Sequence, residues 1–319
     1  MPWNCVTGAV GQFESTTASR RNFLGNSLVL AALGVMPQLA HTAGASPVAR
    51  MIPCDRRQLA VVGLGTWQTF DVGNNGTVRS SLGKLLSRFA ELGGELIDSS
   101  PMYGSAESVV GELVEERHLR DRIFLATKVW TQGMESGVAQ MEESFRRFRT
   151  ARLELLQIHN LQDWKVHLPT LRKWKAEGKI RYLGITHYHS SAYKEIEQIL
   201  RKETVDFLQV NYSLAEPESA RRLLPLAAER GIAVIANRPF AEGRLFAGVK
   251  GKVLPAEASA LGCGTWAQLF LRWILANPAV TCVIPATNRM EHLEDNMGAA
   301  AIRLPGPEDQ HALARMAGF

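Results

Sequence analysis

Eight short apolar runs, separated by amphipathic stretches, occupy the chain from residue 59 onward and leave few folds open to it. The runs are rich in Val, Ile and Leu, as buried parallel strands are, and they cover residues 59–67, 94–100, 122–130, 153–160, 180–187, 205–212, 232–239 and 281–287. The stretches between them have helical periodicity, and three end in a glycine suited to a helix C-cap: Gly93, Gly178 and Gly231. Eight strand–helix repeats predict an α/β fold, a single-domain TIM (β/α)8 barrel over residues 59–319.

A doubly wound open sheet is the alternative arrangement of such repeats. It usually binds a nucleotide through a G-x-G-x-x-G turn between its first strand and its first helix. Here residues 63–67 read G-L-G-T-W, without the third glycine and without a helical pattern directly after them, and the sequence contains no Walker A loop. The barrel is therefore the favoured architecture.

The first 58 residues do not share this alternation. Residues 19–24 read S-R-R-N-F-L, an apolar stretch follows at 27–36, and A-G-A stands at 43–45. Such a combination is typical of an export signal, and the paired arginines resemble the twin-arginine type. We expect residues 1–45 to be a cleaved signal read by the twin-arginine translocase, residues 46–58 to be a linker, and the protein to be periplasmic. Translation from Met51 would leave it cytoplasmic instead.

Composition excludes several classes of function. The net charge is +5, but the Lys and Arg residues are interleaved with acidic ones, so no nucleic-acid partner is expected. No apolar run reaches the ~18 residues of a membrane span, so no stable membrane insertion is expected. The four cysteines form no C-x-x-C pair and no zinc-ligand cluster, so no metal is expected. Cys282 lies in an apolar run and is expected to be buried.

Polar residues stand at the carboxyl ends of three consecutive predicted strands. Asp98 ends the second strand and is followed by Tyr103 in the next turn, Lys128 ends the third, and His159 ends the fourth. Because the chemistry of barrels collects at the carboxyl ends of strands, we expect these four residues, called the tetrad below, at one mouth. A buried lysine or aspartate is costly alone, which favours an ion pair between them.

The tetrad fits the reduction of a carbonyl group. Tyr103 is the expected general acid that protonates the forming alkoxide, and its tyrosinate is the expected base for oxidation. A free tyrosine has a pKa of about 10, and the sequence predicts that Lys128 lowers the pKa of Tyr103, with Asp98 holding the lysine charged. His159 is expected to hydrogen-bond and orient the substrate carbonyl.

These residues make the chain resemble the aldo/keto reductase superfamily over residues 59–300. The stretch I-D-S-S-P-M-Y-G-S-A-E at 97–107 is similar to the superfamily's second-strand signature, and the stretches T-K-V-W and L-L-Q-I-H supply its lysine and histidine. The resemblance implies an oxidoreductase that reduces an aldehyde or ketone to an alcohol with NADP, with NAD as the alternative cofactor.

The resemblance also implies a cofactor site in three parts. The nicotinamide end would be held by Thr186, His187 and Gln209, with Thr66, Trp67 and Asp98 as further cofactor contacts. The pyrophosphate would be held by Asn237, Arg238, Pro239, Phe240 and Gly243, and the adenosine end by Ala286, Thr287, Arg289 and His292 at the phosphate and by Asp295 and Asn296 at adenine. Arg289 is the expected phosphate contact on which the choice of NADP rests, and Thr287 or Asn288 is the expected cap of the helix there.

The chain departs from the family pattern at several of these positions. His187 stands where an amide is usual, and Asn237 with Arg238 stands where many members have an aromatic that stacks on nicotinamide. Ala286 and His292 stand where many NADP-dependent relatives have basic residues. A planar Arg238 guanidinium is the candidate replacement for the aromatic ring.

The resemblance implies Trp67, Trp130 and Asn160 as substrate-pocket residues, and the short tail after residue 300 favours an open pocket and a broad range of substrates or a bulky one. Two other functions stay open. One is a cofactor-binding regulatory subunit, as in potassium-channel β subunits, and the other is a redox-neutral enzyme that acts on a sugar with retained cofactor. An export signal favours both, because nicotinamide cofactor is not expected to be regenerated outside the cytoplasm. The complete tetrad argues against a pure binding module.

Overall fold

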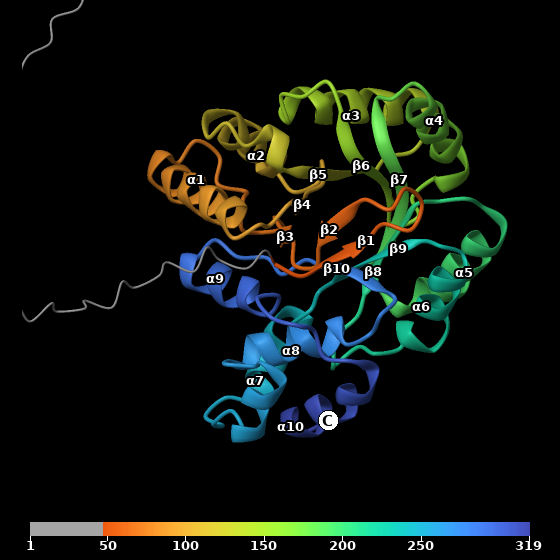
Figure 1. The fold of residues 1–319 in the computed structure, drawn as a ribbon. Helices are drawn as coiled ribbons and strands as arrows, with labels where there is room; N and C mark the ends of the chain where they lie inside the picture. Colours follow the sequence, from red (N-terminus) through yellow and green to blue (C-terminus); the bar gives the residue numbers. More distant parts are fainter. Residues whose placement is uncertain (1–46) are drawn as a thin grey trace, which may run out of the picture. The chain divides into compact units, whose positions relative to one another are not determined.

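Eight parallel strands close into a barrel in the computed structural model, which describes residues 47–319 (Figure 1). In both sequence and hydrogen-bonding order they are β3 (Leu64–Gly65), β4 (Leu96–Asp98), β5 (Phe124–Val129), β6 (Leu153–His159), β7 (Ile180–His187), β8 (Phe207–Asn211), β9 (Ala233–Asn237) and β10 (Val280–Val283). Parallel bridges from Val62 to Val283 and from Gly65 to Ala286 join the last strand to the first. The predicted TIM barrel is confirmed.

Helices surround the strands (Figure 1). They are α1 (Gly76–Glu91), α2 (Ala106–Glu116), α3 (Met134–Arg147), α4 (Trp164–Ala176), α5 (Tyr193–Lys202), α6 (Ser219–Glu229), α7 (Arg244–Gly248), α8 (Trp266–Leu275), α9 (Met290–Gly298) and α10 (Gln310–Ala317). The predicted C-cap glycines Gly93, Gly178 and Gly231 all have positive φ, at +77°, +74° and +63°. The tail after residue 300 forms α10, where Gln310 donates to the Tyr212 hydroxyl at 2.8 Å.

The first predicted strand, 59–67, is interrupted. Its beginning belongs to β2 (Gln58–Ala60), which pairs antiparallel with β1 (Ala49–Met51), and only β3 enters the barrel. At Gly63, between the two, a Cβ atom would lie 2.8 Å from the Leu96 carbonyl oxygen, so the chain passes too close for any side chain. The strand β1 lies within the segment 46–58 for which the sequence suggested a linker.

A separate apolar cluster fills the inside of the barrel. It consists of Leu96, Phe124, Ala126, Leu155, Tyr182, Phe207, Ala233, Ile235, Cys282 and Ile284, together with Ile52 and Leu59 from the β1–β2 hairpin. The hairpin residues therefore seal the amino-terminal end of the strands. Cys282 is fully buried, as predicted. The mouth at the opposite end is left for polar residues.

The expected export signal, residues 1–45, lies outside the residues that the structure describes. Within 47–319, none of the helices combines the length and the apolar character needed to cross a lipid bilayer.

Candidate active site

Asp98 and Lys128 form a buried ion pair at the carboxyl ends of β4 and β5. Lys128 Nζ donates to Asp98 Oδ2 and to the Ser99 carbonyl oxygen, both at 2.7 Å, and the two charged residues are only 0% and 3% exposed. Burial lowers the pKa of Lys128, but the negative charge of Asp98, with a contribution from Tyr103, outweighs burial and holds that pKa above its ordinary value. The lysine therefore carries its charge inside the barrel.

Tyr103 is held beside this pair by a tight turn. Lys128 Nζ lies 5.3 Å from the centroid of the tyrosine ring. The next residue, Gly104, has φ +58°, and a Cβ atom there would collide with the Asp71 carboxyl group. That carboxyl group accepts hydrogen bonds from the backbone N and the Oγ of Ser105, both at 2.9 Å. The loop after β3 thus fixes the turn that presents the tyrosine.

The pKa of Tyr103 moves against the direction that the sequence predicts. Burial raises it most, Lys128 lowers it, Asp98 raises it again, and the sum lies above the ordinary value of 10.0. Lys128 lowers the pKa as predicted, but the prediction left out the loss of solvent, which raises the pKa more than the lysine lowers it. A tyrosine with a raised pKa is protonated at neutral pH, so the hydroxyl proton is present at the site for donation.

His159 ends β6 and faces the tyrosine. The ring centroids of His159 and Tyr103 are 6.0 Å apart, with the planes at 83°, and the Trp130 ring lies 6.5 Å from the histidine. Burial, then the positive charge of Lys128, then His187, lower the pKa of His159 to about 2. The imidazole is therefore neutral and carries a single N–H, which suits a hydrogen-bond donor to a carbonyl oxygen.

Two polar residues that the sequence did not single out touch the tetrad. Gln157 Nε2 donates to Asp98 Oδ1 at 3.2 Å, and Ser100 Oγ lies 3.1 Å from His159 Nδ1. A signal for Gln157 was available, because it precedes His159 by two residues and so shares its face of β6. Ser100 lies in the same turn as Asp98, but its contact joins two strands that are not neighbours.

Thr186 and Gln209 connect the tetrad with the next two strands. His159, Thr186 and Gln209 stand in register across β6, β7 and β8. Gln209 Nε2 donates to Asp98 Oδ1 at 2.9 Å, and its Oε1 accepts from Thr186 Oγ1 at 3.1 Å. Both Asp98 carboxylate oxygens are therefore occupied, and the hydroxyl and amide groups at the mouth form one connected network.

The ends of β7 and β9 bring a stack of planar groups to this network. The His187 and Tyr188 rings are 5.6 Å apart and nearly parallel, and the guanidinium carbon of Arg238 lies 5.6 Å from the Tyr188 centroid. Arg238 has φ +52°, a strained value for a residue with a side chain. Asn237 Nδ2 lies 3.5 Å from Gln209 Oε1, while Asn237 Oδ1 is buried without a hydrogen-bond partner among the described residues.

The rest of the β9 loop is largely structural. Pro239 is buried, and Phe240 packs against Phe246 and Phe270 at centroid distances of 4.8 and 6.5 Å. Gly243, with φ +88°, directly precedes α7. The side chains of Pro239 and Phe240 therefore support the loop, and the backbone is what this segment can offer to a ligand.

In the loop after β10, the role of Ala286 and the residue that caps α9 both differ from the sequence prediction. Ala286 pairs with Gly65 and belongs to the closure of the barrel. Arg289, with extended backbone, is the N-cap residue of α9, and its N–H donates to Thr287 Oγ1 at 3.1 Å. Neither Thr287 nor Asn288 caps the helix, because the threonine hydroxyl closes a turn just before it.

The start of α9 is open to solvent. The Arg289 side chain is 62% exposed and lies 3.5 Å from Glu291, and His292 is also exposed. The first N–H groups of a helix and an adjacent guanidinium both favour an anion. This end of the molecule can therefore receive a phosphate group without displacing a buried contact.

Further along α9, the side chains turn toward α8. Asp295 accepts hydrogen bonds from the side chains of Thr265 and Gln268, each with a shortest distance of 2.9 Å. Asn296 is 4% exposed. The resemblance implied both residues as adenine contacts; in this structure Asp295 instead ties α9 to the start of α8, and Asn296 is buried.

Four more predicted site residues line the mouth in different ways. Thr66 is buried and donates from Oγ1 to the Asp98 carbonyl oxygen at 2.9 Å. Trp67 and Trp130 are 45% and 41% exposed, which is high for tryptophan. Asn160 has φ +52°, and its Oδ1 is buried without a hydrogen-bond partner among the described residues. The mouth thus offers apolar rings at its rim and an unused acceptor deeper in.

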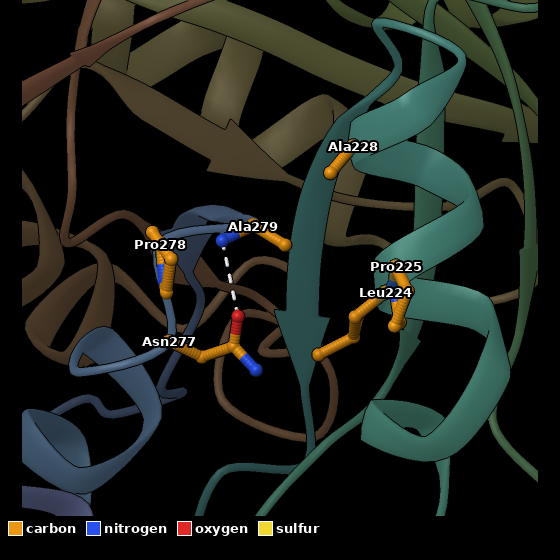
Figure 2. A pocket seen from close by; sticks show the side chains of 6 residues that line it. All are labelled: Leu224, Pro225, Ala228, Asn277, Pro278 and Ala279. Carbon is orange, nitrogen blue, oxygen red and sulfur yellow. Dashed lines mark hydrogen bonds between the residues drawn. The ribbon is translucent and has the colours of Figure 1, made fainter. Parts of the chain in front are cut away.

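A cavity of about 310 Å³ lies between α6 and the turn before β10 (Figure 2). It is lined by residues of α6 and of the turn before β10: Leu224, Pro225, Ala228, Asn277, Pro278 and Ala279. The turn is fixed by a hydrogen bond from Ala279 N to Asn277 Oδ1 at 3.0 Å. The turn leads into the amino-terminal end of β10, and in barrels that end of the strands serves stability rather than chemistry.

The donor set of the mouth fits a nicotinamide cofactor. The amide and hydroxyl groups of Gln209 and Thr186 and the unpartnered oxygen of Asn237 suit a carboxamide, and they adjoin the tetrad. Arg289 and the open start of α9 suit a phosphate. Among residues 47–319 we find no group of three or more His, Cys, Asp or Glu residues placed to hold a metal ion.

Comparison with known proteins agrees with this arrangement. The sequence pattern of the Aldo/keto reductase family matches residues 61–313. The chain is 30% identical over 257 residues to methylglyoxal reductase YeaE of Escherichia coli, covering 78% of this chain and 88% of the relative. An aldo-keto reductase from Klebsiella pneumoniae, solved in complex with NADPH, is 30% identical with a TM-score of 0.70, over 85% of this chain and 95% of that one. An aldo-keto reductase from Bacillus halodurans, at 21% identity and a TM-score of 0.68 over 85% and 96% of the two chains, shares the fold.

Proposed function

The chain belongs to the aldo/keto reductase family of NAD(P)-dependent oxidoreductases, and on this premise we propose that it reduces an aldehyde or ketone to an alcohol with NADPH. One observation carries the proposal: a charged lysine, a protonated tyrosine and a neutral histidine meet at one mouth of the barrel. NADPH, when bound, supplies the hydride that goes to the carbonyl carbon. The residues of the chain manage the charge that develops on the carbonyl oxygen.

Tyr103 is the proton donor in this proposal. Its raised pKa keeps the O–H intact until the oxygen of the substrate becomes basic. Lys128 stabilises the tyrosinate that is left, and Asp98 keeps the lysine charged and in place. His159, neutral and aimed at the same region, donates a hydrogen bond that orients the carbonyl and stabilises the oxyanion. Solvent then returns a proton to the tyrosine.

NADP is the proposed cofactor, with NAD as the alternative. Gln209, Thr186 and Asn237 would hold the nicotinamide carboxamide, and Arg289 with the start of α9 would meet the adenosine phosphate. The exposed cation supports NADP, since the extra phosphate is a strong partner for a guanidinium. The Klebsiella relative, which was solved with NADPH, supports the same choice.

The rim of the mouth supports a substrate with an apolar part. Trp67, Met102, Trp130 and Met134 follow barrel strands and are 41–60% exposed. Exposed rings and thioethers at a binding mouth favour aromatic or aliphatic groups over ions. Methylglyoxal, for which the YeaE relative is named, is the small carbonyl to compare with such aromatic and aliphatic substrates.

Transfer of deuterium tests the reaction class. Protein from Ser46 onward is given NADPH deuterated at the transferring position, with methylglyoxal or an aromatic aldehyde. The proposal requires one deuterium on the carbinol carbon of an alcohol product and an equal amount of NADP⁺. Tight NADPH binding with no labelled alcohol from any carbonyl in the panel would refute it.

The twin-arginine motif at residues 19–24 favours a second candidate. An exported protein lacks a cytoplasmic supply of NADPH, so it would act as a redox-neutral enzyme on a sugar or as a cofactor-binding regulatory subunit, with the cofactor retained. Sequencing the amino terminus of the native protein tests whether the protein is exported with its signal removed. A terminus near Ser46 together with cofactor that survives gel filtration supports this candidate, and a terminus at Met51 removes its basis.

A further inference from the structure

Ser100 is a buried hydroxyl group with a single partner. It is 0% exposed, and its Oγ makes one hydrogen bond within the described residues, to His159 Nδ1 at 3.1 Å. The neighbouring Ser99 contrasts with it, because the Ser99 hydroxyl is equally buried and bonds to nothing in the described part of the chain. The turn after β4 thus aims one of its two serines at the histidine.

The contact restricts the position of the imidazole proton. A neutral imidazole carries its proton on Nδ1 or on Nε2, and a serine hydroxyl can donate or accept. If Nδ1 carried the proton, Ser100 Oγ would accept it, and the serine's own O–H would stay buried without an acceptor. If Nε2 carries the proton, Ser100 donates to Nδ1 and both groups are satisfied. Buried donors without partners are rare, so the second arrangement is favoured.

The same arrangement is the one that carbonyl reduction needs. Nδ1 is occupied by Ser100, and no described side chain hydrogen-bonds Nε2, so Nε2 is the atom left for a ligand. A donor for a carbonyl oxygen must have its proton on that atom. In a doubly protonated ring both nitrogens would carry a proton. The low pKa of His159 excludes that form, so only one of the two nitrogens is protonated.

We propose that Ser100 is a positioning residue that fixes His159 as the Nε2–H tautomer and so directs its donor at the substrate carbonyl. This inference deepens the proposed function and rests on it for the role of the histidine. The hydroxyl acts through Nδ1 and touches neither substrate nor cofactor. It would also resist a flip of the ring, because a flipped ring would place a carbon atom against Ser100 Oγ.

Nitrogen-15 NMR of the histidine side chain tests the tautomer directly, without turnover. His159→Gln assigns the signals in protein labelled at histidine. The expected result is a protonated Nε2 and an unprotonated Nδ1 in the wild type, and a mixture of tautomers in Ser100→Ala. A protonated Nδ1 in the wild type overturns the proposal, as does an unchanged spectrum in Ser100→Ala. Both outcomes are readable even if no carbonyl is ever reduced, so this failure is distinct from failure of the proposed function.

Kinetics then separate positioning from support of the fold. We expect Ser100→Ala to lower kcat about tenfold, with the Kd for NADPH unchanged, and Ser100→Thr to recover most of the rate. Ser213→Ala is the matched control, because its hydroxyl is also fully buried but has no partner among the described residues. A kcat for Ser100→Ala equal to that of Ser213→Ala would overturn the role of the serine in the reaction.

Discussion

The catalytic mouth and the loop after β10 hold their charged residues in opposite ways. Asp98 and Lys128 are buried, and every polar atom of the pair contacts a partner from another strand or turn. Arg289 extends into solvent, with Glu291 as an ion-pair partner at 3.5 Å. One region meets its charges with partners inside the protein, and the other keeps its charge accessible to solvent.

This difference indicates what each region contributes. Groups that must be in place for proton transfer are most effective when they are fixed in advance, because no reorganisation is then needed during the reaction. A site that only binds an anion gains from accessible charge and has little to gain from burial. Substitutions at the mouth should therefore change both stability and rate, while those on the loop should change cofactor affinity alone.

Lys128→Met is expected to have the largest effect. It leaves the Asp98 carboxylate buried without its cation, which costs about 3–5 kcal/mol in the free energy of unfolding, and it removes the stabiliser of the tyrosinate. We expect a loss in kcat of about a hundredfold or more. The double variant Asp98→Asn with Lys128→Met should recover stability but not activity. Urea unfolding and steady-state kinetics measure both. Recovery of the rate in the double variant would contradict the mechanism.

Arg289→Ala is expected to have a smaller and more selective effect. We expect the Kd for NADPH to rise about tenfold, with the Kd for NADH and the kcat unchanged, because one charge-assisted contact is lost. Stability should stay within about 0.5 kcal/mol, as for other surface substitutions. Fluorescence titration of both cofactors, with Lys173→Ala on α4 as the surface control, measures this. Equal weakening of NADPH and NADH binding would show that Arg289 does not bind the adenosine phosphate that distinguishes the two cofactors.

The pH dependence of reduction should be the smallest effect. The pKa of His159 is lowered to about 2, so the ring is already neutral in the working range, and the raised pKa of Tyr103 means that its acid form persists beyond pH 10. We expect kcat/KM to vary by no more than about twofold from about pH 6 to about pH 9. A fall with a midpoint well below pH 10 would instead support a tyrosine pKa lowered by Lys128, the direction that the sequence predicts.

The sequence predicts well where one residue's place follows from its position on a strand. The alternation of apolar runs predicts the barrel, and strand ends predict that Asp98, Lys128 and His159 converge, because parallel strands share one carboxyl edge. It fails where the outcome depends on several distant segments at once. The pKa of Tyr103 depends on how much solvent the surrounding loops exclude, and the contact of Ser100 with His159 joins the turn after β4 to the end of β6, which is not a neighbouring strand.

Loops show the same limit. The N-cap residue of α9 is Arg289 and not Thr287 or Asn288, because the Thr287 hydroxyl closes a turn just before the helix. No pattern in the sequence predicts that turn. The first predicted strand is divided between β2 and β3, and Gly63 lies at the division, where the chain passes close to the Leu96 carbonyl oxygen. The sequence alone does not show which of its glycines is needed for such a close approach. These features concern how the barrel is closed and covered, and the position of the tetrad does not depend on them.

Tyr103→Phe tests the central claim most directly, because it removes one hydroxyl group and leaves the ring in its turn. Single-turnover oxidation of NADPH is followed together with the Kd for NADPH, using a carbonyl that the wild type reduces. The account predicts a loss in rate of about a hundredfold or more, with the Kd unchanged. A variant that oxidises NADPH at close to the wild-type rate would show that the proton comes from another group, and the role given to the tetrad would be wrong.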